Sequence, residues 1–438
     1  MGFWRVALLA LVGGTGFAIA VAASTGAVRD TTRVTVHVRE WEFTDAVPDT
    51  APTGTVVFTI VNDGSFAHSF SINGHTTPPI PGGTIATLTV VFAEPGAYTF
   101  NSTVDDVDKE MVGVFTVTGA PVATTPPPPT TPTDPSTSSL PLVHVADVPL
   151  PGGSSRFDYQ ALDGRTHRLY IAHLGASQVI AVDVKQRRVV RDVGGISSVH
   201  GVIEAGRIYA TATGSHQLVA LRARDLHVLW RAPAGSFPDG LAYEPTHKRV
   251  FVADETGGAD VVVDARRGRR VRTIELGGEA GNVQYNPVAR RVFAAVAGRE
   301  QLAVIDPRRL RIVARYALPG CQGAHGVHLD PPRRLAFVAC EDNARLLVVD
   351  LRRGRTTATF SVGETPDVLD FDPGLRRLYV ADESGVVAVF AERGRGLTKL
   401  GQDFLAPAAH SVAVDPATHL VYFPLEGGPV LRVMRPRG

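Results

Sequence analysis

The sequence has few of the residues that mark several common protein classes. Only two cysteines occur among 438 residues, which excludes a disulfide-rich scaffold and a multi-cysteine metal cluster. Charged residues make up only 20% of the chain and the formal net charge is +1, so composition favours no nucleic-acid partner. What the chain does have is 44% hydrophobic residues, 44 glycines and 31 prolines. These values predict a large core built from many short strands and turns.

The N-terminal segment has the pattern of an export signal. Arg5 precedes an uncharged apolar run over residues 6–23, and the small residues Ala20 and Ala22 fit a cleavage site. We interpret residues 1–25 as a cleaved signal peptide, and a retained single anchor is the alternative. Either way the mature protein is expected to be extracytoplasmic: secreted, periplasmic or associated with the cell envelope. Membrane contact is expected only through an uncleaved N-terminal segment.

Residues 31–119 alternate apolar and polar side chains with the two-residue period of strands. The expected strands, separated by turn-forming clusters, are Val34–Phe43, Thr55–Val61, Ser69–Ile72, Thr84–Phe92, Ala97–Asn101 and Val112–Thr118. This spacing predicts a small β-sandwich. Residues 120–140 are rich in proline and threonine, and they predict an extended linker.

The segments NDGSFAHSFSI and GAYTFNSTVDDVDKEMVGVFTV make this sandwich resemble the cupredoxin-like family. In copper-binding members the resemblance implies a histidine in the first segment, followed by a cysteine, a histidine and a methionine in the second. His68 and Met111 occupy two of these positions, but Asn101 or Ser102 stands at the cysteine position. The site is therefore interpreted as degenerate: a type 1 copper is not expected, and the fold is interpreted as a structural or docking module.

Residues 141–438 contain one repeated unit. In five copies a proline lies six residues before an aromatic strand residue, and the spacings between these prolines are 42, 44, 42 and 43 residues: Pro245, Pro287, Pro331, Pro373 and Pro416. A period near 42 residues with four short strands predicts a β-propeller blade. Two weaker copies, over 156–173 and 198–213, bring the number of blades to seven.

The last copy ends after its third strand, and residues 142–153 resemble the closing strands of other copies. We therefore expect an all-β chain, with a cupredoxin-like β-sandwich and a seven-bladed propeller that is closed by pairing its own terminal strands. The R-[LV]-[YF]-[IV]-A strand and the HG…DP…RRLAFVAC segment resemble the YVTN-type propellers of secreted bacterial proteins. That resemblance implies a fold and leaves the function open.

Polar residues recur at two positions of the repeat that should open on one mouth of the propeller channel. The position six residues before the proline holds Asp158, His200, Asp239, Gly281, His325, Asp367 and His410. The loop after the second strand of the blade supplies His173, Asp254, Glu255, Glu341, Asp382 and Glu383. Two interpretations stay open. These groups can satisfy loop backbone in each repeat, or they can bind a ligand or a divalent metal, for which His200, His325 and His410 are the strongest candidates.

The two cysteines, Cys321 and Cys340, lie 19 residues apart within one repeat. Both should lie in loops of the same face, so an exported protein is expected to join them in a disulfide. The alternative is metal ligation by Cys321 with His325.

The function that these observations favour is that of an exported, non-enzymatic binding or scaffold protein, expected to be monomeric. Its partner would be a protein, a cell-envelope component or a small molecule that binds at the propeller mouth or rim. The alternative is a lactonase-like, metal-dependent hydrolase or lyase that acts on a small extracellular molecule at the propeller axis.

Overall fold

The computed structural model describes residues 32–39, 42–43, 48–63, 68–77, 80, 83–102, 111–119 and 140–437. The chain divides into two compact units, Met1–Pro132 and Thr133–Gly438. The expected export signal, and the linker up to residue 139, lie outside the described residues. Within the described ranges, no helix is long and apolar enough to cross a membrane.

The first unit is a β-sandwich of two sheets. One sheet has the strand order β2-β1-β4-β7, with bounds β1 Thr32–Arg39, β2 Glu42–Phe43, β4 Gly54–Asn62 and β7 Ile85–Phe92. The other has the order β3-β9-β8-β5-β6, with bounds β3 Thr50–Pro52, β5 Ser71–Ile72, β6 His75–Thr76, β8 Gly96–Asn101 and β9 Val112–Thr118. The two short strands β3 and β6 were not expected from the sequence. Aromatic side chains such as Phe58, Phe92 and Phe115 form the core between the sheets.

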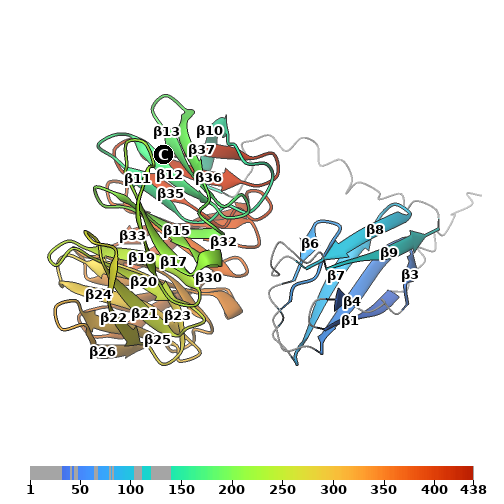
Figure 1. Cartoon of the computed structure of the whole chain (residues 1–438). Coiled ribbons are helices and arrows are strands. Elements are labelled where there is room, and N and C mark those ends of the chain that lie inside the picture. The colour runs from blue at the N-terminus through green and yellow to red at the C-terminus, as the bar shows by residue number, and fades with distance from the viewer. Residues whose placement is uncertain are drawn as a thin grey trace, which may run out of the picture. The chain divides into compact units, whose positions relative to one another are not determined.

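The second unit is a seven-bladed β-propeller of four-stranded antiparallel sheets (Figure 1). Blade 1 contains β11 Gln160–Asp163, β12 Arg168–His173, β13 Gln178–Asp183 and β14 Arg188–Gly194. Blade 2 contains β15 Val199–Glu204, β16 Ile208–Ala212, β17 Gln217–Leu221 and β18 Val228–Pro233. Blade 3 contains β19 Pro238–Glu244, β20 Arg249–Asp254, β21 Ala259–Asp264 and β22 Arg269–Glu275. Blade 4 contains β23 Glu279–Asn286, β24 Arg291–Ala297, β25 Gln301–Asp306 and β26 Arg311–Ala317. Blade 5 contains β27 Ala324–Asp330, β28 Leu335–Cys340, β29 Arg345–Asp350 and β30 Arg355–Ser361. Blade 6 contains β31 Pro366–Asp372, β32 Arg377–Asp382, β33 Val386–Arg393 and β34 Gly396–Phe404. Blade 7 contains β35 Ala413–Asp415, β36 Leu420–Leu425, β37 Val430–Pro436 and β10 Leu142–Pro149. Two 3-10 turns, η2 Thr213–Ser215 and η3 Glu341–Asn343, follow second strands.

The burial pattern of each strand reflects its position in the blade. Second strands such as β12 and β28 are almost wholly buried, because they lie between the faces of two neighbouring blades. Outer strands such as β26 alternate exposed and half-buried positions. The repeated aromatic residue also links blades, since the Tyr170 hydroxyl donates to the Ala223 carbonyl and the Tyr209 hydroxyl donates to the Ala265 carbonyl.

In the five copies with the repeated proline, the residue just before it is Asp, Glu or Asn, and this D/E/N-P turn has a structural task. The Asp372 carboxylate, before Pro373, accepts the backbone N–H groups of Gly374 and Leu375, and the Asn286 side chain, before Pro287, does the same for Val288 and Ala289. Such turns satisfy backbone donors that would otherwise be unpaired at the blade edge. This task explains why the repeat keeps these residue types at this place.

The ring closes by pairing the two ends of the propeller, as the sequence predicts. β10 pairs antiparallel with β37, from Leu142 opposite Pro436 to Pro149 opposite Val430, and Figure 1 shows the two strands side by side. Arg432 donates two hydrogen bonds, of 3.0 and 2.9 Å, to the carboxylate of Asp147 across this pair. This pairing supplies the fourth strand of blade 7 and covers the edge that β37 would otherwise expose.

The two cysteines form a disulfide, Cys321–Cys340. It joins the loop that leads into β27 to the end of β28, and both residues are buried. Because both sulfur atoms are used in this bond, metal ligation by Cys321 with His325 is ruled out in this state.

Candidate functional site

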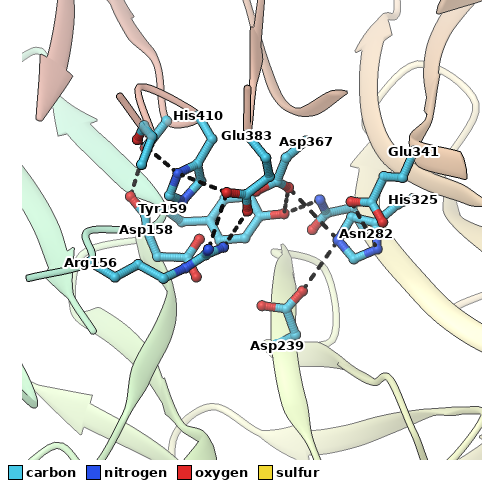
Figure 2. A network of polar contacts seen from close by, with 12 residues as sticks. Arg156, Asp158, Tyr159, Asp239, Asn282, His325, Glu341, Asp367, Glu383 and His410 are labelled. Atoms are coloured by element: carbon cyan, nitrogen blue, oxygen red, sulfur yellow. Dashed lines mark hydrogen bonds and ion pairs between the residues drawn. The ribbon is translucent and has the colours of Figure 1, made fainter. Parts of the chain in front are cut away.

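Polar side chains from several blades meet in one cluster, which we call the axial cluster (Figure 2). Its members are Arg156, Asp158, Tyr159, Asp239, Glu255, Asn282, His325, Glu341, Asp367, Glu383 and His410. The Tyr159 hydroxyl, from blade 1, donates to Asp367 Oδ1 of blade 6 at 3.3 Å and accepts a hydrogen bond from Asn282 of blade 4. Blades 1 and 4 lie on different sides of the ring, so their side chains can meet only near its axis.

Short side chains next to the polar residues allow this convergence. Residue 201 is glycine because a Cβ there would lie 2.3 Å from the carbonyl oxygen of Asp239, and residue 326 because a Cβ would lie 2.0 Å from the Asp367 carbonyl oxygen. The innermost strands of neighbouring blades therefore approach backbone to backbone. Blade 1 has Tyr159 at this position instead, and its ring extends into the space near the axis.

A salt bridge lies on one side of the cluster. Arg156 donates two hydrogen bonds to the Glu383 carboxylate, at 3.1 and 2.5 Å, which is the bidentate geometry expected of a guanidinium. His410 lies beside it, with Nδ1 at 3.6 Å from Glu383 Oε2. Burial raises the pKa of Glu383, but His410 and Arg156 outweigh it and hold that pKa below its ordinary value. Glu383 is therefore ionised and already paired.

His325 is surrounded by carboxyl groups on the other side. Its Nε2 lies 3.6 Å from Asp239 and 3.8 Å from Asp367, and its Nδ1 lies 3.7 Å from Glu341. Burial alone would lower the pKa of His325, but these carboxylates raise it to about 10. Both ring nitrogens face acceptors, so His325 is an imidazolium and supplies a fixed positive charge.

The carboxyl groups of the cluster are poorly neutralised. Burial, together with neighbouring acids, raises the pKa of Asp158 to about 7, of Asp367 to about 6 and of Glu341 to about 8. The pKa of Asp239 also rises well above its ordinary value, and burial is the main cause. Like charges collected in a water-poor place disfavour ionisation, so the cluster takes up protons near neutral pH.

The expected candidates separate into three groups. Asp158, Asp239, His325, Asp367 and His410 meet in the axial cluster.

Within the described part of the chain, His200 makes no hydrogen bond or ion pair with a carboxyl group of the axial cluster. Its Nδ1 donates to the Ser198 carbonyl at 2.8 Å, its ring packs against Phe237, and burial lowers its pKa to about 4.

The loop residues His173, Asp254 and Asp382 serve the loop backbone. The Asp254 carboxylate accepts N–H groups from Ser236 and Phe237, and Asp382 accepts the N–H of Gly363. His173 contacts the Ser155 hydroxyl and the Pro151 carbonyl. At these three positions the role visible in the structure is the structural one, since unpaired loop backbone is costly when buried.

Arg156 and Tyr159 were missed from the sequence. Arg156 lies two residues before the repeated polar position, and the other copies share no residue type at that place. Tyr159 had a detectable signal, because it stands where three other blades have glycine: Gly201, Gly240 and Gly326.

The residues of the degenerate copper motif lie in the sandwich. His68 is buried and its backbone pairs with that of Ile80, while Met111 belongs to the hydrophobic core. Ser102, one of the two residues expected at the cysteine position, accepts the N–H of Ser69 with its hydroxyl. A hydroxyl cannot replace the thiolate of a blue-copper site, so the expectation of no type 1 copper stays a prediction based on these residues.

No family model matches the chain, and no curated protein matches it. Among solved structures, a chain of hydrazine synthase from Kuenenia stuttgartiensis is 15% identical with a TM-score of 0.57, covering 67% of this chain and 97% of its own length. A chain of the mitotic checkpoint complex is 12% identical with a TM-score of 0.57, covering 67% of this chain and 91% of its own. At such identities the likeness establishes the propeller fold alone.

Proposed function

We propose that this chain is an exported, non-enzymatic binding protein whose axial cluster holds a small cationic ligand. The observation that carries the proposal is the imbalance of charge in that cluster. Six carboxyl groups face only two permanent cations: Asp158, Asp239, Glu255, Glu341, Asp367 and Glu383 against Arg156 and His325.

This imbalance favours a positively charged ligand. Buried carboxylates without partners are costly, and without a ligand the protein lowers that cost by protonating some of them. A bound cation would balance the charge directly and release those protons. The side chains near the axis come from blades 1, 3, 4, 5, 6 and 7, so a small cation held there would be contacted from several blades at once.

The proposal also covers the cellular location of the protein and the families of its two domains. The buried disulfide Cys321–Cys340 is typical of proteins from oxidising compartments, and together with the sequence pattern of residues 1–25 it supports an extracytoplasmic site of action. We further propose that the first unit is a cupredoxin-like module without type 1 copper that serves for docking, and that the propeller is of the YVTN type.

A second candidate is an enzyme acting at the same place. The pKa values of Asp158, about 7, and of Glu341, about 8, are raised mainly by burial. They suit general acid–base catalysis near neutral pH. This candidate would require a metal-dependent hydrolase or lyase activity on a small molecule.

The test is calorimetric titration of the full chain, treated with chelator, with three probes: the dication putrescine, a divalent metal chloride and the dianion succinate. We expect at least one cation to bind with a stoichiometry near one, and succinate not to bind. The double variant Asp239→Asn/Asp367→Asn should weaken that binding because it removes two carboxylates while keeping side-chain shape.

Glu275→Gln is the matched control, since Glu275 is an exposed acid on the outer strand β22. It should bind as the unmodified protein does. Failure of both cations to bind, or equal binding by the double variant, would overturn the proposal. Hydrolysis of lactone or ester substrates, lost in the double variant, would establish the enzyme instead.

A further inference from the structure

We propose that Asp158, Asp367 and His410 form a binding site for a divalent first-row transition-metal ion. The proposal rests on the proposed function, because it lies in the same axial cluster, and it narrows the ligand from a small cation to a metal. One ligand atom from each of these three residues lies within 4.8 Å of the other two. The three residues come from blades 1, 6 and 7, and they are 2%, 5% and 0% exposed.

Two atoms of this group have no partner in the part of the chain that the structure describes. Asp158 Oδ1 and His410 Nε2 are both buried and make no hydrogen bond there. A buried polar atom without a partner costs free energy, and native proteins usually satisfy such atoms. Two unsatisfied atoms on residues already grouped in space therefore point to a missing species that contacts both.

The hydrogen bonding of His410 prepares it as a metal ligand. Its Nδ1 lies 3.0 Å from the Ala408 carbonyl oxygen, which can only accept, so Nδ1 carries the proton. Nε2 then has a free lone pair. A ring nitrogen that donates to a backbone carbonyl while the other nitrogen faces a metal is the usual arrangement of a metal-bound histidine.

The charged groups beside this site are already paired with other side chains. Arg156 donates two hydrogen bonds to the Glu383 carboxylate. Glu383 is thereby occupied. His325 is different, because both of its ring nitrogens face carboxyl groups, so it has no buried nitrogen without a partner comparable to His410 Nε2.

The donor set selects the class of metal. Two carboxylates and one imidazole suit zinc, manganese, iron or cobalt, whereas calcium and magnesium prefer oxygen ligands alone. Three protein ligands also leave at least one coordination position for water or for a small molecule. The site would thus be able to present a metal-bound molecule at the propeller axis.

The experiment is titration of the full chain, stripped with chelator, with CoCl2 and with ZnCl2. Cobalt binding is followed by visible absorption and zinc binding by calorimetry. We expect one ion per chain and a cobalt spectrum typical of nitrogen and oxygen ligands. Asp158→Asn and His410→Gln should each weaken binding by more than about 100-fold, because losing a ligand exceeds the roughly 10–100-fold effect of changing a group behind one.

His200→Gln is the matched control. His200 occupies the equivalent position of blade 2 and also donates from Nδ1 to the carbonyl two residues earlier, at 2.8 Å. A purely local structural role would therefore make His200→Gln and His410→Gln behave alike. Near-UV circular dichroism shows whether a variant folds. If His410→Gln fails to fold, Asp158→Asn, which keeps the side-chain shape, becomes the test of the metal site.

Three results would overturn the metal site. Absence of metal binding while putrescine still binds would refute the metal and leave the proposed function standing. Absence of binding by either would refute both. Metal binding that survives Asp158→Asn and His410→Gln would place the ion elsewhere and refute this assignment of ligands.

Discussion

Replacement of Asp260 should stabilise the propeller. Asp260 lies in β21, it is fully buried, and neither of its carboxyl oxygens has a hydrogen-bond partner among the described residues. Its neighbours across the sheet are Ala253 and Ile274, which belong to an apolar cluster between blades 3 and 4. Other blades have an aliphatic residue at the equivalent position of the third strand: Val179, Leu218, Leu302, Leu346 and Val387.

The size of the effect follows from the pKa. Burial raises the pKa of Asp260 to about 8, compared with about 3.9 for an unfolded chain. Below about pH 4 the carboxyl group is protonated in both states. As pH rises from about 4 to 8, the unfolded state ionises first, so the free energy of unfolding falls by about 1.4 kcal/mol per pH unit, or roughly 4 kcal/mol by pH 7. Above pH 8 both states are ionised and the loss stays constant.

Two variants separate charge from packing. Asp260→Asn has nearly the same shape and does not titrate, so it should abolish this part of the pH dependence. Asp260→Leu should do the same and add about 1.5–3 kcal/mol from apolar burial, less any strain from its larger side chain.

The assay is urea unfolding of the full chain at several values between pH 5 and 8.5, followed by tryptophan fluorescence. The difference between the unmodified protein and Asp260→Asn isolates this group, because all other titrating groups are common to both. Parallel stability curves for the two proteins would refute the reasoning, since they would show that Asp260 does not change its protonation on folding. Lower stability of Asp260→Leu at pH 8 would refute the packing argument.

Three further predictions concern the ring and its cluster. Replacing Cys321 and Cys340 by alanine should lower the free energy of unfolding by about 3 kcal/mol, since the disulfide closes a loop of 19 residues; equal urea midpoints for the two proteins would contradict this. Tyr159→Phe should cost about 1–3 kcal/mol in the same assay, because the amide of Asn282 loses its acceptor at a buried position; an unchanged midpoint would show that the hydroxyl is dispensable. Deleting residues 430–438 removes the strand that pairs with β10, so cooperative thermal unfolding should be lost in calorimetry; a single sharp transition in the shortened chain would disprove the need for closure.

The architecture of the propeller could be predicted from the sequence because each blade is specified locally. The prolines at intervals of 42 to 44 residues, the aromatic residue six positions later and the D/E/N-P turn all act within one copy of the repeat. Ring closure was also predictable, because the last copy lacks a fourth strand that residues 142–153 supply. The disulfide followed from having two cysteines in one repeat, near the same face.

The membership of the axial cluster was only partly predictable. Sequence periodicity identified Asp158, Asp239, His325, Asp367 and His410 as facing one mouth of the ring. It could not separate them from His173, Asp254 and Asp382, which have the same residue types and serve the loop backbone. That separation depends on which donors lie within reach of each side chain in three dimensions.

Thus the sequence by itself determined the blade, the number of blades and the way in which the ring closes, since these depend on contacts within a repeat or between neighbouring repeats. The tertiary structure alone decided which polar groups meet and in what protonation state. The Tyr159 hydroxyl reaches an aspartate 208 residues away, and the Arg156 guanidinium reaches a glutamate 227 residues away. Such contacts depend on the curvature of the whole ring, which brings distant strands to one axis. The pKa values there depend on the burial that the same curvature creates.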